Sequence, residues 1–226
     1  MKTLFIVLFT SLAVGCASGG QLLDTTTGQV AEGNIFSFRD TVVKVNPDFN
    51  FIQINDKDKI PGNDIDTGFP DIYRTENIYL FFALDDYNKV IKAAMINLVQ
   101  LSDSQIRWDQ RVDLLKDVQA IQKGKENIDG KEHWYWVSKC LALSEKVYFA
   151  LEDEGFRLGS FRCWLTKSYA TFIGIDSGTF LTITYMEGLN NCHGLDHTGQ
   201  YVGSYWGKKI AEFCERLSEN IQISHN

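Results

Sequence analysis

The sequence predicts an α+β fold, in which an antiparallel sheet of hairpins carries one inserted helix and a C-terminal helix packed on the sheet. Two patterns lead to this prediction. Several segments alternate apolar and polar residues with a period of two, which is typical of strands, and turn-forming residues separate them. Two other segments repeat apolar residues every three or four positions, which indicates amphipathic helices.

The first expected strands occupy residues 35–54, and Asn46-Pro47-Asp48 is expected to form a hairpin turn between them. Residues 55–74, which are rich in Asp, Gly and Pro, are expected to form a long loop. The next two strands are expected at 78–84 and 90–101. The second of these also fits a helical stripe, so a helix is the alternative there.

The inserted helix is expected to begin at Ser102 or Asp103 and to end near Lys123-Gly124. The C-terminal helix is expected over residues 200–221. Its apolar stripe is Trp206, Ile210, Phe213 and Leu217. Further strands are expected at residues 133–143, 147–151, 160–173 and 179–186.

The first fifteen residues have the layout of a signal peptide: Lys2, then an apolar run, then Gly15. The eleven residues 4–14 would rise only about 16 Å as a helix, against roughly 30 Å of hydrocarbon in a bilayer. The segment Leu12-Ala13-Val14-Gly15-Cys16 resembles the bacterial lipobox. A plain secretory signal is the alternative.

The lipobox resemblance implies cleavage before Cys16 and attachment of acyl chains to Cys16, which would anchor the protein in a membrane of the bacterial envelope. Because Ala17 follows, the family's sorting rule implies the outer membrane, with the protein facing the periplasm. The expected organisation is a signal peptide at 1–15, a lipidated Cys and polar tether at 16–33, and one globular domain at 34–226.

The charge composition of the chain argues against two kinds of partner, nucleic acid and an anionic membrane surface. After cleavage 21 basic side chains face 29 acidic ones, a net charge of −8, which argues against nucleic acid. The chain has no dense cluster of Lys and Arg that would attract an anionic membrane surface. The membrane is therefore expected as a partner through the acyl chains alone, beside an envelope protein or cell-wall partner.

The other cysteines are Cys140, Cys163, Cys192 and Cys214, an even number in a chain expected in an oxidising compartment. Their order in the chain suggests the disulfides Cys192–Cys214 and Cys140–Cys163. Four buried free thiols are the alternative.

The segment 192–197, Cys-His-Gly-Leu-Asp-His, is the densest group of metal-ligand residue types, but its Gly and Asn neighbours favour a solvated loop. The acidic residues between Asp56 and Asp71 do not match a calcium-loop register. The carboxylates of 152–154 are adjacent, but a charged turn explains them. Trp134 and Trp136 should share one face of a strand, either as a binding platform or packed beneath a helix.

The chain lacks the glycine-rich phosphate loop, the dinucleotide fingerprint and the nucleophile elbow. We therefore expect a non-catalytic, lipid-anchored envelope domain that binds or scaffolds a partner, with no cofactor and no metal. The alternative is an envelope hydrolase, or a metal- or small-ligand-binding protein that uses the segment 192–197. The order of the expected elements is similar to that of the Mog1/PsbP-type α/β/α sandwich, which includes small envelope lipoproteins.

Overall fold

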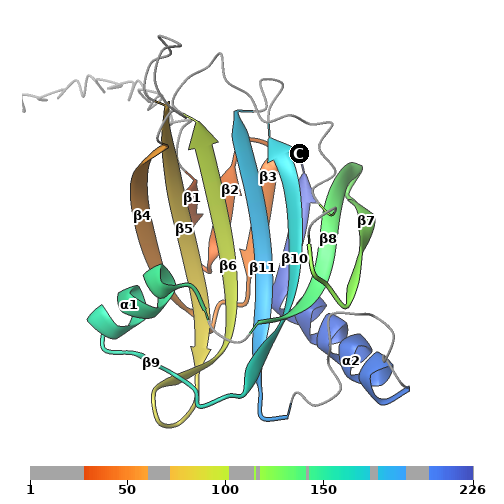
Figure 1. The fold of residues 1–226 in the computed structure, drawn as a ribbon. Helices are drawn as coiled ribbons and strands as arrows, with labels where there is room; N and C mark the ends of the chain where they lie inside the picture. Colours follow the sequence, from red (N-terminus) through yellow and green to blue (C-terminus); the bar gives the residue numbers. More distant parts are fainter. Residues whose placement is uncertain are drawn as a thin grey trace, which may run out of the picture.

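The computed structural model describes residues 28–60, 72–101, 115, 118–140, 143–173, 178–191 and 204–225. Side chains are described for these residues except 56–60, 72–74, 140, 204 and 205. The described chain forms two sheets and two helices, arranged in three layers (Figure 1).

The central layer is a sheet of eight strands, here called the large sheet. Seven of them are antiparallel neighbours in the order β4-β5-β6-β11-β10-β8-β7, and the short β9 pairs with β6 in parallel. Their bounds are β4 (Asn50–Ile60), β5 (Ile72–Leu84), β6 (Lys89–Leu101), β7 (Gln122–Ile128), β8 (Lys131–Cys140), β9 (Arg157–Leu158), β10 (Cys163–Ile173) and β11 (Thr179–Leu189).

A smaller antiparallel sheet of four strands, in the order β1-β2-β3-β12, packs on one face of the large sheet. Its bounds are β1 (Gln29–Ala31), β2 (Ile35–Phe38), β3 (Thr41–Val45) and β12 (Ile221–His225). β1 brings residues 29–31, which the expected tether of 16–33 included, into the folded domain.

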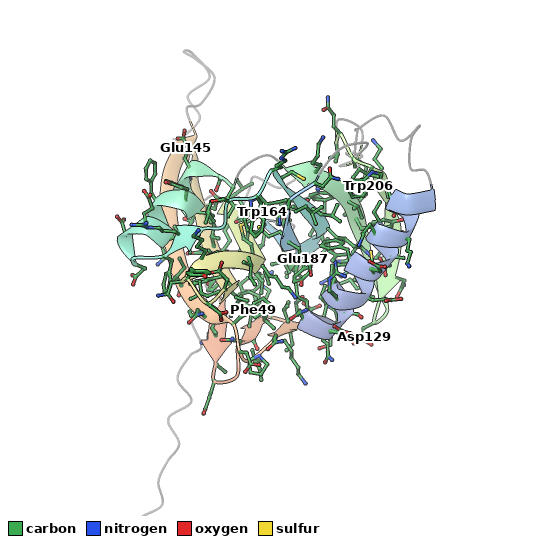
Figure 2. The ribbon with its side chains drawn as sticks, turned by 90° about the horizontal axis from the view of Figure 1, so that it is seen from below. Phe49, Asp129, Glu145, Trp164, Glu187 and Trp206 are labelled. Carbon is green, nitrogen blue, oxygen red and sulfur yellow. The ribbon has the colours of Figure 1, made fainter. Side chains whose placement is uncertain are left out.

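Helix α2 (Ser204–Asn220) covers the same face of the large sheet as the small sheet does, and helix α1 (Glu145–Asp153) lies on the opposite face. Figure 2 shows the two helices on opposite sides, with Trp164 toward α1 and Glu187 toward α2. The alternation of side chains along each strand produces two separate apolar clusters. On β5, Tyr79 and Phe81 belong to the cluster under α2, while Leu80 and Phe82 belong to the one under α1.

Several predictions are confirmed. The fold is α+β and dominated by antiparallel strands. Residues 90–101 form a strand, β6, because both faces of this segment are covered and its apolar residues need not alternate with polar ones. The stripe of the C-terminal helix packs on the sheet as expected, with Phe213 fully buried against Tyr185 at a ring distance of 5.5 Å.

The prediction of a strand at 147–151 is wrong, since this segment belongs to helix α1. Its aromatic and β-branched residues resemble a strand, but Val147 and Leu151 lie four positions apart and are both buried on one side. Ser144 occupies the N-cap position, and Gly155, at φ +83°, turns the chain after the helix.

The expected end of the inserted helix is also wrong. Residues 102–114 lie outside the described part of the chain, but Lys123-Gly124 lies in β7. Pairing with β8 explains this, because the Ile121 amide donates to the Val137 carbonyl at 2.8 Å and begins the ladder. Gly124 admits the Tyr135 ring, which a Cβ at this position would meet at 3.1 Å.

Asn46-Pro47-Asp48 does not form the expected hairpin turn, because β3 and β4 belong to different sheets. The chain crosses here from the small sheet to the large sheet, and side-chain amides hold this crossing. Asn34 Nδ2 donates to the Phe49 carbonyl at 2.8 Å, and Asn46 Nδ2 donates to Asn220 Oδ1 at 3.1 Å. The expected loop 55–74 is shorter than predicted, since β4 extends to residue 60 and β5 starts at residue 72, while residues 61–71 lie outside the described part.

The end of the C-terminal helix also differs slightly from the prediction, because Ile221 starts β12. Asn220 ends the helix by donating from Nδ2 to the Arg216 carbonyl at 2.7 Å. Residues 221–225 then pair with β3, with Ile221 opposite Val45 and His225 opposite Thr41.

Candidate interaction surface on helix α1

Helix α1 packs on the outer face of the large sheet. Val147 and Leu151 are 2% and 1% exposed and belong to the apolar cluster of this face. After the helix, the Phe156 ring packs edge-on against Phe82 at 4.9 Å. The Gly159 amide then donates to the Val90 carbonyl at 3.0 Å, which fixes β9 beside β6. The buried side of the helix and the segment that follows it are therefore attached to the sheet.

The outward side of α1 presents two adjacent aromatic side chains. Tyr148 is 39% exposed and Phe149 is 57% exposed, and their rings meet edge to face at 5.7 Å. Only two other large hydrophobic side chains among those described are exposed, Phe51 and Tyr87. Two neighbouring exposed aromatics on a helix of nine residues form an apolar spot of the kind that marks interaction sites.

Acidic side chains surround this spot. Glu145, Glu152 and Asp153 are exposed on the same helix, and Glu154 follows it. The Tyr148 hydroxyl donates to Glu152 Oε1 at 2.5 Å, and this hydrogen bond and the carboxylate charge raise the pKa of Tyr148.

The only cation within the helix, Lys146, forms a salt bridge with Glu76 of β5 at 3.2 Å. The carboxylates of α1 therefore stay without a neutralising charge from the helix itself. We call Glu145, Tyr148, Phe149, Glu152 and Asp153 the α1 surface. Its chemistry suits a partner that places basic groups around an apolar side chain.

The adjacent carboxylates noted in the sequence, residues 152–154, lie at the end of α1 and are exposed. A general acid or base works best in a partly dehydrated cleft beside a reactive group. Their position on an open helical surface fits electrostatic recognition better than proton transfer.

The two tryptophans of β8 share one face, as the alternation predicts, while Tyr135 belongs to the opposite face. Both are half-buried, so they do not form an open platform. Trp134 packs edge-on against Phe172 at 5.7 Å, and the Lys125 ammonium lies 5.2 Å from its ring.

The structure describes only some of the cysteines for which the sequence predicts a role. Cys16 and the segment 192–197 lie outside the described residues. Cys214 is a half-buried free thiol on α2, in contrast to its expected bond with Cys192. Cys163 is buried and disulfide-bonded. The bonding partner of Cys163 lies outside the described side chains, so the expected pair Cys140–Cys163 stays a prediction.

Two polar clusters were missed in the sequence because their members are far apart in the chain. In the first, Glu187 of β11, which is 6% exposed, accepts three hydrogen bonds from the Arg216 guanidinium of α2. Nε donates to both carboxylate oxygens at 3.0 Å, and Nη2 donates to Oε2 at 2.7 Å. The Tyr185 hydroxyl donates to its Oε1 at 2.7 Å, and Lys92 lies 3.9 Å away. The pKa of Tyr185 is raised mainly by its burial and further by the Glu187 carboxylate.

The Glu187 cluster satisfies its own members and joins α2 to the sheet, so its role is structural. The second cluster joins His133 of β8 to His225 of β12, with Nε2 atoms 2.8 Å apart.

Within the described part of the chain, no group of three or more His, Cys, Asp or Glu side chains has the arrangement of a metal site. No described helix is both long and apolar enough to span a bilayer.

Comparison with protein-family models, with curated proteins and with solved structures finds no match for this chain.

Proposed function

We propose that the protein is a non-catalytic, lipid-anchored domain of the bacterial envelope, and that it binds a basic protein segment through the α1 surface. The acyl chains on Cys16 would hold it at the outer membrane, facing the periplasm. The observation that carries the binding proposal is the exposed Tyr148–Phe149 pair within a group of carboxylates.

The anchor is supported by the run Leu12-Ala13-Val14-Gly15-Cys16 after a charged and apolar start. Several acyl chains on one residue suffice for stable anchoring, since two such signals already do. Twelve residue steps separate Cys16 from Gly28, whose carbonyl accepts a hydrogen bond from the buried Tyr79. At about 3.5 Å per residue the folded domain would lie within about 40 Å of the lipid surface.

The choice of a basic partner rests on charge complementarity. An exposed aromatic pair gains free energy when it is buried by apolar side chains. Under a neutral or acidic partner, Glu145 and Asp153 would stay without an ionic partner and Glu152 would keep only its hydrogen bond from Tyr148, which disfavours such partners. A protein segment with Lys or Arg beside an apolar side chain satisfies both requirements.

The test is a photocrosslinking experiment in the native host. A benzophenone amino acid replaces Phe149 in the full-length anchored chain, and a control chain carries it at Ser218, an exposed position on α2. We expect a single protein adduct at position 149 and none at position 218. The identified partner should carry Lys or Arg within the crosslinked peptide.

A charge-reversal variant separates specific binding from chance contact. The triple change Glu145→Lys, Glu152→Lys and Asp153→Lys should abolish the adduct, while Glu215→Lys on α2, an exposed control, should leave it unchanged. Circular dichroism checks that both variants fold. No adduct at position 149, the same adduct at both positions, or an acidic crosslinked peptide would contradict the proposal.

A further inference from the structure

The last residue of β12 makes a histidine pair that joins the two sheets. His225 Nε2 lies 2.8 Å from His133 Nε2, and the two rings stack at a centroid distance of 5.0 Å and an angle of 28°. His133 belongs to the large sheet and is fully buried, whereas His225 belongs to the small sheet and is partly exposed. The His225 amide also donates to Asp129 Oδ2 in the β7–β8 turn at 3.0 Å.

A contact of 2.8 Å between two ring nitrogens requires one protonated and one unprotonated nitrogen. One arrangement of the ring hydrogens gives every neighbouring group a partner, with all the hydrogen bonds donated in the same direction along the chain of contacts. His133 Nε2 donates to His225 Nε2, His225 Nδ1 donates to Thr41 Oγ1 at 3.2 Å, and the Thr41 hydroxyl donates to Asp40 Oδ1 at 3.3 Å. In this arrangement a second proton on His225 would occupy Nε2, place two N–H groups against each other and break the contact. A second proton on His133 would occupy the buried Nδ1, where loss of hydration opposes the charge.

The surroundings of the pair disfavour an added charge. His133 Nδ1 is buried and has no hydrogen-bond partner among the described residues, and the Tyr169 ring of β10 stands edge-on beside the imidazole at 6.4 Å. Burial, then the positive charges of His225 and Lys131, lower the pKa of His133 to about 4.

The charged groups near His225 act in opposite directions. Burial and Lys131 lower its pKa, whereas Asp40 and Asp129 raise it, and the net direction is downward. Lys131 is itself paired with Asp40 at 3.4 Å.

β12 is well placed to respond to the loss of this contact. It is the edge strand of the small sheet and pairs with β3 only. On the side toward the large sheet, its terminal residue is held by the His133 ring and by the Asp129 carboxylate.

We propose that the His133–His225 pair is an acid-sensitive latch: it fastens β12 to the large sheet near neutral pH, and its protonation releases the strand while the rest of the fold persists. In the released state both imidazoles meet water and take up protons near the ordinary pKa of 6.5. Acid therefore favours release. This inference is independent of the α1 surface, which lies on the opposite face of the large sheet.

Hydrogen exchange of the full folded domain measures the release directly. The protection of the backbone amides of residues 221–225, corrected for intrinsic exchange rates, is compared at pH 7.5 and pH 5.0. His133 alone predicts that protection falls by about 30-fold, because its pKa of about 4 lies well below 6.5. The amides of β10 and β11 should keep their protection and serve as the internal control.

The variant His133→Gln keeps a hydrogen-bonding side chain that does not titrate, and it should remove most of the acid-dependent fall, since only His225 still titrates. If that variant does not fold, His225→Gln and an NMR titration of the wild-type imidazoles replace it, and His133 should titrate below pH 5. Equal protection of β12 at both pH values, the same fall in the folded variants, or a His133 that titrates above pH 6 would overturn the proposal.

Discussion

Replacing Arg216 by Met should reveal how much the Glu187 cluster contributes to the attachment of α2. The change keeps most of the volume of the side chain but removes all three hydrogen bonds to Glu187. The Glu187 side chain is only 8% exposed. Without Arg216 its carboxylate would lose its main ionic partner, and little water could replace that partner. Lys92, at 3.9 Å and one-third exposed, replaces that partner poorly.

The magnitude follows from the exposure of the two partners. Removing one member of a fully buried ion pair costs about 3–5 kcal/mol. Arg216 is 37% exposed, so solvent screens part of this interaction, and the Tyr185 hydroxyl still donates to the carboxylate. We therefore expect a loss of about 2–3 kcal/mol in the free energy of unfolding. For a domain of this size that equals about 4–12 °C in melting temperature.

Urea unfolding followed by circular dichroism provides the measurement, with Lys208→Met as the control on the same helix. Lys208 is 80% exposed and pairs with Glu212 at 3.8 Å, so this change should cost no more than about 0.5 kcal/mol. The double variant Glu187→Gln with Arg216→Met should be more stable than Arg216→Met alone, since no unpaired carboxylate remains. If Arg216→Met fell within 0.5 kcal/mol of the wild type, the structural role assigned to the cluster would be wrong.

Three further predictions concern stability and the thiols. Leu217→Ala, at a position of α2 that is 7% exposed and faces the sheet, should cost about 2–5 kcal/mol of unfolding free energy, and an unchanged urea midpoint would contradict its packing. Because the folded-state pKa of His133 is lowered to about 4, its contribution is complete above pH 6.5 and is lost as the pH falls toward 4. The wild type should thus lose about 2 kcal/mol more than His133→Gln between pH 7.5 and pH 5.0 in urea titrations, whereas parallel losses would exclude this linkage. Alkylation of the denatured, unreduced protein followed by peptide mapping should label Cys214 and leave Cys163 unlabelled, and the reverse pattern would contradict the structure.

Strands with a clear partner could be predicted from the sequence. β10 and β11 pair along their whole length, from Cys163 opposite Leu189 to Ile173 opposite Thr179, so local preference and tertiary pairing agree. The stripe of α2 was equally clear, because Phe213 and Leu217 repeat at the helical period and face one side.

The errors arose where local pattern and tertiary contacts differ. Residues 147–151 have strand-forming side chains, yet only a helix places Val147 and Leu151 together on the sheet. Residues 221–225 continue the α2 stripe at Ile221, but β3 offers them a free edge. The crossing at Asn46 depends on an amide contact with Asn220, which is 174 positions away and leaves no local signal.

The candidate sites were hard to predict for the same reason, because they depend on tertiary contacts. The adjacent carboxylates at 152–154 were visible in the sequence, but the exposure of Tyr148 and Phe149 depends on which side of α1 meets the sheet. The His133–His225 pair joins residues 92 positions apart, so neither histidine could be distinguished from an ordinary solvated one.

The most direct test of the proposed function is the identity of the mature amino terminus. The full-length protein is purified from the membrane fraction of its host, and its N-terminal peptide is measured by mass spectrometry. We expect this peptide to begin at Cys16 and to carry a thioether-linked diacylglycerol, and we expect Cys16→Ser to leave the chain unprocessed. A mature terminus at any other residue, or an unmodified Cys16, would contradict the proposed lipid anchor.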